Sequence, residues 1–111
     1  MSERRFRVVW AEAAAADLEE LVAFVAENSS IEAERLLERL RRVAGRLESM
    51  PARGRVVPEL ARFGIGSWRE LVTKPYRLVY RLTGDTVTVV ALYDGRRDLE
   101  DVLLERLLRL G

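Results

Sequence analysis

Two stretches in the N-terminal half of the chain repeat apolar residues at helical spacing. In residues 11–27 and again in residues 31–50, apolar side chains fall three or four positions apart, which predicts two amphipathic helices. The expected buried stripes are Ala14, Leu18, Leu21, Val22 and Val25 in the first helix, and Leu36, Leu40, Val43, Ala44 and Leu47 in the second. Ser29 stands three residues before Glu32, a capping-box pattern that marks the start of the second helix. Because the connection is so short, the two helices should form an antiparallel hairpin.

The C-terminal half alternates apolar and polar residues, which is typical of strands. Strands are predicted at residues 68–73, 76–82 and 86–93, with a short first strand at residues 5–10. Gly84 and Asp85 form a two-residue hairpin turn, which sets the register of the last two strands. The residues expected to face the helices are then the pairs Leu82 and Val87, Tyr80 and Val89, and Leu78 and Ala91. Arg77, Arg81 and Leu92 are expected on the opposite face.

The order of the elements predicts an α+β fold. An N-terminal strand and an antiparallel helical hairpin should pack on an antiparallel β-meander, followed by a C-terminal helix that Asp98 caps and that runs to about residue 110. Residues 51–67 hold two Pro and three Gly and are predicted as a loop, with a short element near residues 58–62. At 111 residues, the whole chain is expected to be one domain.

Composition excludes several kinds of chemistry. The chain has no Cys and no His, so disulfides, Cys or His zinc sites, Cys nucleophiles and His general bases are all excluded. No carboxylate cluster suggests a metal site, and no cofactor is expected. No apolar run approaches the roughly 18 residues of a membrane span, and the N-terminus lacks the apolar core of a secretory signal. A cytoplasmic protein that does not bind membranes is therefore expected.

Charge is strongly segregated although the net charge is only +1. Residues 8–34 hold seven acids and no base, whereas residues 53–81 hold seven bases and two acids. Five arginines lie on or beside the predicted meander: Arg69, Arg77, Arg81, Arg96 and Arg97. Burying an arginine without a partner is costly, so these side chains should either line an open anion-binding surface or pair with carboxylates. For Arg77 and Arg97 the carboxylates considered are Glu70, Asp94 and Asp98.

Five short motifs, taken in order, resemble the RelE/ParE superfamily, the toxins of bacterial type II toxin–antitoxin pairs. They are Ala14-x-x-Asp17-Leu18-x-x-Leu21, Gly54-Arg55-x-Val57-Pro58-Glu59-Leu60, Arg69-Glu70-Leu71, Tyr76-Arg77-Leu78-Val79-Tyr80-Arg81 and Gly95-Arg96-Arg97-Asp98-Leu99. The chain looks most like the ParE branch. The resemblance implies the fold predicted above and a toxin held inactive by a cognate antitoxin in a hetero-oligomer.

The resemblance leaves two modes of action open. RelE-like members cleave mRNA on the ribosome, and for that mode the catalytic candidates are Arg69, Arg77 and Arg97. Metal-free RNA cleavage also needs an acid and a base, but Leu71 and Leu103 stand where the nuclease branch has a basic residue and a Tyr or His. ParE-like members poison DNA gyrase, and this is the preferred interpretation.

For the preferred mode, the candidates for binding the antitoxin or the target are Arg81, Arg96, Tyr93, Leu99 and Leu103. Arg41, Arg42 and Arg46 are expected on the solvated face of the second helix, where they could also meet an acidic antitoxin tail. A third alternative is a family member that has lost its toxicity.

Overall fold

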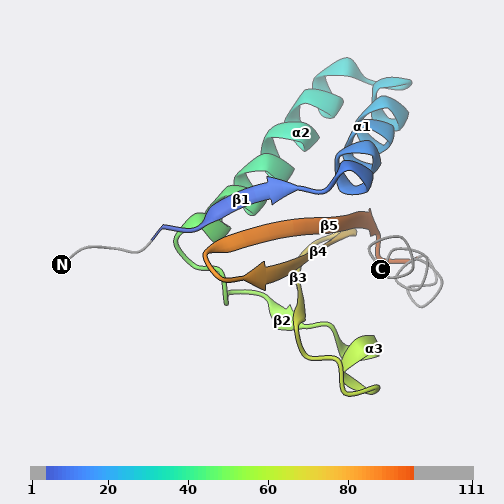
Figure 1. Ribbon diagram of the computed structural model, residues 1–111. Coiled ribbons are helices and arrows are strands. Elements are labelled where there is room, and N and C mark those ends of the chain that lie inside the picture. Colours follow the sequence, from blue (N-terminus) through green and yellow to red (C-terminus); the bar gives the residue numbers. More distant parts are fainter. Residues whose placement is uncertain (1–4, 97–111) are drawn as a thin grey trace.

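The computed structural model describes residues 5–96 of the chain. In chain order the elements are β1 (Arg7–Trp10), α1 (Glu12–Ala26), α2 (Ser30–Gly45), a 3₁₀ turn η1 (Arg46–Glu48), β2 (Arg55–Val56), α3 (Pro58–Ala61), β3 (Trp68–Thr73), β4 (Tyr76–Thr83) and β5 (Thr86–Asp94). The two long helices form a layer on one face of the sheet, and α3 lies on the opposite side (Figure 1). The predicted α+β class is confirmed. The expected C-terminal helix lies outside the described residues.

The strands form one sheet in the order β1-β5-β4-β3-β2. β2 to β5 make the expected antiparallel meander, but β1 pairs with β5 in parallel, so the sheet is mixed. Strand alternation predicts that residues 5–10 are extended, but it carries no information about which distant strand they join. None of the helices in residues 5–96 is long and apolar enough to cross a membrane.

The helical hairpin confirms the predicted boundaries at one end and shortens them at the other. The hydroxyl of Ser29 accepts a hydrogen bond from the backbone N–H of Glu32 at 3.1 Å, as the capping pattern predicts. α2 ends at Gly45, about five residues earlier than expected, and continues as the 3₁₀ turn. Such tightening is common at helix ends. Leu47 still reaches the core from this turn and is fully buried.

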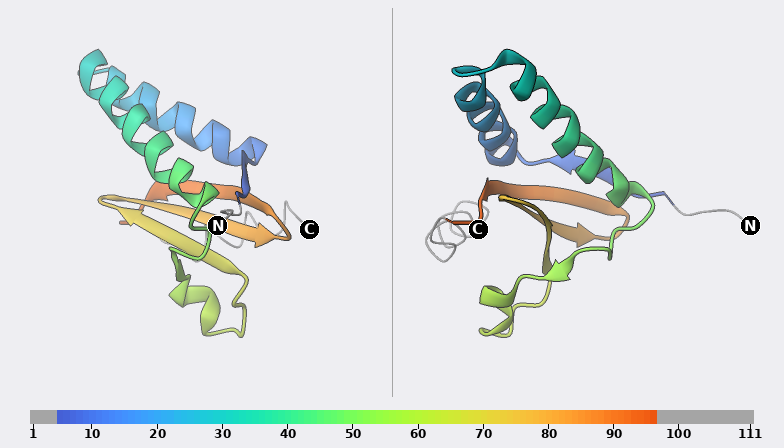
Figure 2. Two further views of the ribbon diagram at one scale, coloured as in Figure 1. Left: turned by 90° about the vertical axis from the view of Figure 1, so that its left-hand side faces the viewer. Right: turned by 180° about the vertical axis from the view of Figure 1, so that it is seen from behind.

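Two apolar cores lie on the two faces of the sheet. On the helix side, Leu36, Leu40, Ala44 and Leu47 pack against β4 and β5 residues that include Leu78 and Tyr80. On the other side, Val57, Leu60 and Trp68 pack against Val79, Val90, Ala91 and Tyr93. Figure 2 shows the hairpin above the sheet and the α3 segment below it. The segment predicted as a loop therefore covers much of the second face, which sequence analysis left open.

A β-bulge corrects the predicted register of the last hairpin. Leu82 lies opposite Val87 and Tyr80 opposite Val89, as expected, but Leu78 lies opposite Leu92 rather than Ala91. The shift occurs between Val79 and Tyr80, where β5 contains one extra residue, Val90. Because a one-residue insertion exchanges the two faces of a strand, Leu92 joins the helix-side core and Ala91 the opposite core.

Asp17 ties α1 to the sheet beyond the end of β1. β1 ends at Trp10, opposite Val89, so it does not flank the last residues of β5. The carboxylate of Asp17 accepts a hydrogen bond from the backbone N–H of Leu92 at 3.1 Å. A buried N–H without an acceptor would be costly, so this motif residue fixes the helix against the strand.

Candidate functional site

Arg77, at the start of β4, lies between two carboxylates on the face of the sheet opposite the helices. Its Nε donates to Glu70 at 2.8 Å, and its Nη2 bonds to the same carboxylate oxygen. Its Nη1 and Nη2 donate to the two carboxylate oxygens of Glu59 at 3.0 and 3.1 Å. The Arg77 side chain is only 12% exposed. Every nitrogen of its guanidinium therefore already bonds to a carboxylate, in the geometry that an anionic ligand would otherwise take.

Glu70, in the middle of β3, is the fully buried centre of this network. Its second carboxylate oxygen accepts from Nε of Arg55 at 2.7 Å, because β2 places Arg55 directly opposite Glu70 in the sheet. Burying a carboxylate is tolerated only when it is paired and hydrogen-bonded. Glu59, Glu70, Arg77 and Arg55 are hereafter called the ion network, and it joins β2, α3, β3 and β4.

A second set of contacts fixes the loop before β2 to the same strands. The hydroxyl of Tyr80 donates to the carbonyl of Pro51 at 2.7 Å and accepts from the backbone N–H of Gly54 at 2.9 Å. Nη1 of Arg69 donates to the carbonyl of Gly54 at 2.7 Å. Both backbone polar groups of Gly54 are therefore satisfied by side chains of β3 and β4.

The three residues named for RNA cleavage are not gathered into one site. Arg69 lies opposite Tyr80 and Arg77 lies opposite Val72, so alternation along the strands places the two arginines on opposite faces of the sheet. Arg69 holds the Gly54 loop, and Arg77 belongs to the ion network. Arg97 lies outside the described residues.

The residues named for partner binding differ in accessibility. Arg96 is exposed and pairs with Asp94 at 2.5 and 2.9 Å. Arg81 is half-buried, with its guanidinium 5.5 Å from the ring of Trp68. Tyr93 is only 4% exposed, because its ring packs in the second core beside Arg77. Burial raises the pKa of its phenol, so it stays neutral. Leu99 and Leu103 lie outside the described residues.

Sequence analysis missed Glu59, Gly54 and Tyr80 as partners in this region. All three belong to the motifs on which the family resemblance rests, and that was the available signal. The pairing of Arg77 with Glu70 was one of the two alternatives that the sequence left open, and it is the one observed.

The pair of Glu59 and Arg77 predicts a pH-dependent contribution to stability. Hydrogen bonding to Arg77 holds the pKa of Glu59 below its usual value of 4.5, against the opposing effect of burial. The pair therefore stabilises the fold fully above about pH 4.5, and its contribution is lost as the pH falls below that value. We expect the free energy of unfolding in urea to fall less between pH 6 and pH 3 in Glu59→Gln than in the unaltered chain. Equal falls in the two proteins would contradict the pairing.

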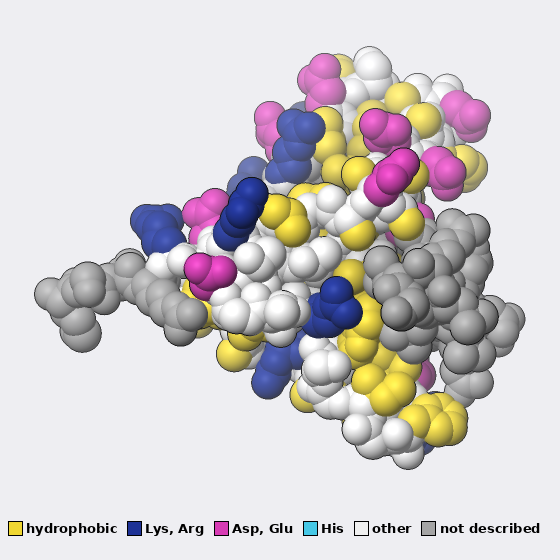
Figure 3. Space-filling model, in the orientation of Figure 1, with side chains coloured by type: hydrophobic (Ala, Val, Ile, Leu, Met, Phe, Trp, Pro, Cys, Tyr) yellow, Lys and Arg dark blue, Asp and Glu magenta, His cyan; other side chains and the backbone are white. Residues whose placement is uncertain are grey.

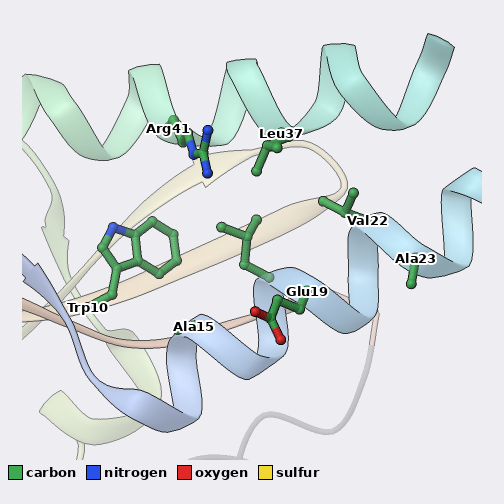
Figure 4. Close-up of a pocket in the computed structure, with 8 residues that line it drawn as sticks. Trp10, Ala15, Glu19, Val22, Ala23, Leu37 and Arg41 are labelled. Atoms are coloured by element: carbon green, nitrogen blue, oxygen red, sulfur yellow. The ribbon is translucent and has the colours of Figure 1, made fainter. Parts of the chain in front are cut away.

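The largest depression in the described surface is an apolar groove between α1 and α2, beside the end of β1. It has a volume of about 480 Å³, and its lining includes Trp10, Leu18, Val22 and Leu37. Figure 4 shows Glu19 and Arg41 on the two banks of the groove, one from each helix. Nothing in its lining offers nucleophilic or acid–base chemistry beyond the single carboxylate.

Within residues 5–96 no group of three or more acidic side chains is arranged to hold a metal ion. The surface charge follows the segregation seen in the sequence. Figure 3 shows acidic side chains gathered over α1 and the outer end of the hairpin, and basic side chains along α2 and below the sheet. The described surface therefore offers charged contact areas rather than a reaction centre.

The fold and these motifs define a class of small α+β toxins. The model of the ParE toxin of type II toxin–antitoxin systems (parDE) matches residues 8–99. The chain belongs to this family. It is 33% identical over 94 residues to toxin ParE3 of Caulobacter vibrioides, covering 84% of this chain and 90% of that protein.

Solved structures show the same fold at lower identity. A chain of the chromosomal ParDE system of P. aeruginosa aligns with a TM-score of 0.68 at 17% identity, covering 82% of this chain and 97% of that one. A chain of the toxin–antitoxin complex RelBE2 of Mycobacterium tuberculosis aligns at 0.61 and 22% identity, covering 84% and 94%. A mutant of the E. coli toxin RelE in the free state aligns at 0.61 and 16% identity, covering 96% and 99%.

Proposed function

We propose that this ParE-family toxin stops growth by binding and inhibiting DNA gyrase, and that a cognate antitoxin neutralises it by direct binding. Its membership of the ParE family favours gyrase over mRNA as the target, because poisoning of gyrase is the mode that the resemblance to the ParE branch implies. Toxin–antitoxin systems are also the subject of two of the solved relatives, which supports a protein partner.

The observation that carries the proposal is the state of Arg77. Stabilising a phosphorane requires cations aimed at the phosphate, but all three nitrogens of Arg77 are bonded to Glu59 and Glu70. Arg69 is committed to Gly54 on the other face. The sequence also contains no His that could transfer a proton.

Expression of the toxin without antitoxin tests the proposal through two readouts from one culture. We expect growth to stop and DNA-damage signalling to rise, while primer extension on cellular mRNA finds no new 5′ ends. New ribosome-dependent 5′ ends without DNA damage would instead establish the mRNA-cleaving mode. Continued growth at strong expression would indicate a family member that has lost its toxicity.

A further inference from the structure

Four arginines form a continuous stripe along one side of the second helix. Arg35, Arg39, Arg42 and Arg46 are spaced at i, i+4, i+7 and i+11 over α2 and the first residue of η1. This spacing returns to the same side of a helix at each step, so the stripe extends for about 16 Å. All four residues are exposed. These residues are hereafter called the arginine stripe.

The arginine stripe is largely unneutralised. Arg35 pairs with Glu32 at 2.9 Å, but among residues 5–96 no carboxylate forms an ion pair with Arg39, Arg42 or Arg46. Elsewhere in the chain, the arginines of the ion network and Arg96 all bond to carboxylates. The stripe therefore keeps a positive charge that an acidic partner would complement.

The stripe borders a depression with an apolar floor. Its volume is about 460 Å³, and it lies between α2 and the start of β4. Arg35, Arg39 and Arg42 line one wall, while Val25, Leu36 and Tyr76 supply apolar surface. A partner that fits must bring acidic groups and apolar side chains at matching spacing, as the two faces of an amphipathic helix do.

A nucleic acid fits this surface less well than a peptide does. Glu32 and Glu38 also line the depression, and their carboxylates would repel phosphates. A phosphate backbone also brings no apolar group to cover Leu36 and Tyr76. Glutamate and leucine side chains of one helix satisfy both parts of the surface.

We propose that the arginine stripe and the adjoining depression bind an acidic, amphipathic helical segment of the antitoxin. This inference rests on the proposed function, since it names the surface through which neutralisation takes place. The partner's helix pairs its carboxylates with Arg39, Arg42 and Arg46 and inserts apolar side chains over Leu36 and Tyr76.

The test measures the affinity of the full-length toxin for the protein encoded by the gene beside its own, by titration calorimetry at low and moderate salt. We expect the double variant Arg39→Glu/Arg42→Glu to weaken binding by about 30-fold or more and to reduce its salt dependence. The neutral variant Arg39→Gln/Arg42→Gln should lose less affinity. Arg41→Glu is the matched control, because Arg41 lies on the same helix but lines the separate groove between α1 and α2.

The outcomes separate this inference from the proposed function. Tight binding that is unchanged in both double variants, with unchanged thermal melting, overturns the inference and leaves the function standing. An equal loss in Arg41→Glu also overturns it, since the partner then covers the groove between α1 and α2. Loss of binding to an RNA oligonucleotide alone assigns the stripe to nucleic acid instead. If the unaltered toxin binds no product of the neighbouring gene, the proposed function fails and this inference fails with it.

Discussion

Replacing Gly54 by alanine should destabilise the protein by about 2–4 kcal/mol, the scale of forced overpacking in a tight interior. A Cβ at this position would lie 2.5 Å from the backbone carbonyl of Glu70 and 2.7 Å from the hydroxyl of Tyr80. The carbonyl belongs to the centre of a strand and cannot move without disturbing the sheet. The methyl group must therefore push the loop away, which breaks the hydrogen bonds that Gly54 makes to Tyr80 and Arg69.

Gly45→Ala is the matched control for this substitution. A Cβ on Gly45 would meet nothing within 4 Å, and the residue is the last of α2, where alanine is the better helix former. We expect this variant to melt at or slightly above the temperature of the unaltered chain. Gly54→Ala should melt lower by roughly 10 °C or more, by the usual relation between stability and melting temperature for a domain of this size. Similar melting of the two variants would contradict the close approach at Gly54.

Replacing Glu70 by alanine should cost about 3–5 kcal/mol, because removing one partner of a buried ion pair leaves the other charge uncompensated. Glu70 is 1% exposed and holds both Arg55 and Arg77. Without it, the guanidinium of Arg77 keeps only Glu59 as a partner. Urea unfolding measures the change directly, and Glu70→Gln, which preserves the shape but not the charge, should lose less.

Glu48→Ala provides the comparison for a surface pair. Glu48 bonds to Arg5 at 3.3 Å, and the two side chains are 50% and 71% exposed. Solvent screening limits such pairs to between about 0 and 1 kcal/mol. If Glu70→Ala were no more destabilising than Glu48→Ala, the ion network could not be the structural element that joins β2, α3, β3 and β4.

The sequence predicts those parts of the fold that depend on periodic patterns. Residues 11–27 and 31–50 show helical spacing, and the Ser29 cap and the Gly84 turn mark boundaries that the structure confirms. The register error at Leu92 arises because a bulge leaves no mark in an unbroken apolar run such as Val89 to Leu92. The partner of β1 was equally beyond reach, since its pairing depends on the path of the whole chain.

The candidate site shows the same division. The sequence allowed Arg77 either an open anionic ligand or a carboxylate such as Glu70, and only the structure shows that the second holds. Glu59 was missed because α3 has only four residues, too few to show a period, and its approach to Arg77 depends on packing by Val57 and Leu60. Once Thr73 pairs with Tyr76, strand alternation alone separates Arg69 from Arg77.

These placements give the meander arginines a structural meaning. Arg55, Arg69 and Arg77 hold the segment from Gly54 to Glu59 against the sheet, whereas Arg39, Arg42 and Arg46 on α2 keep their charge for a partner. In this account the toxin has a scaffold related to that of mRNA-cleaving toxins but acts by binding proteins.

The most direct test of this claim is a DNA supercoiling assay with purified gyrase and purified toxin. We expect the toxin at micromolar excess to block supercoiling, and addition of the antitoxin to restore it. Unchanged supercoiling at that excess, with a folded toxin, would contradict the account.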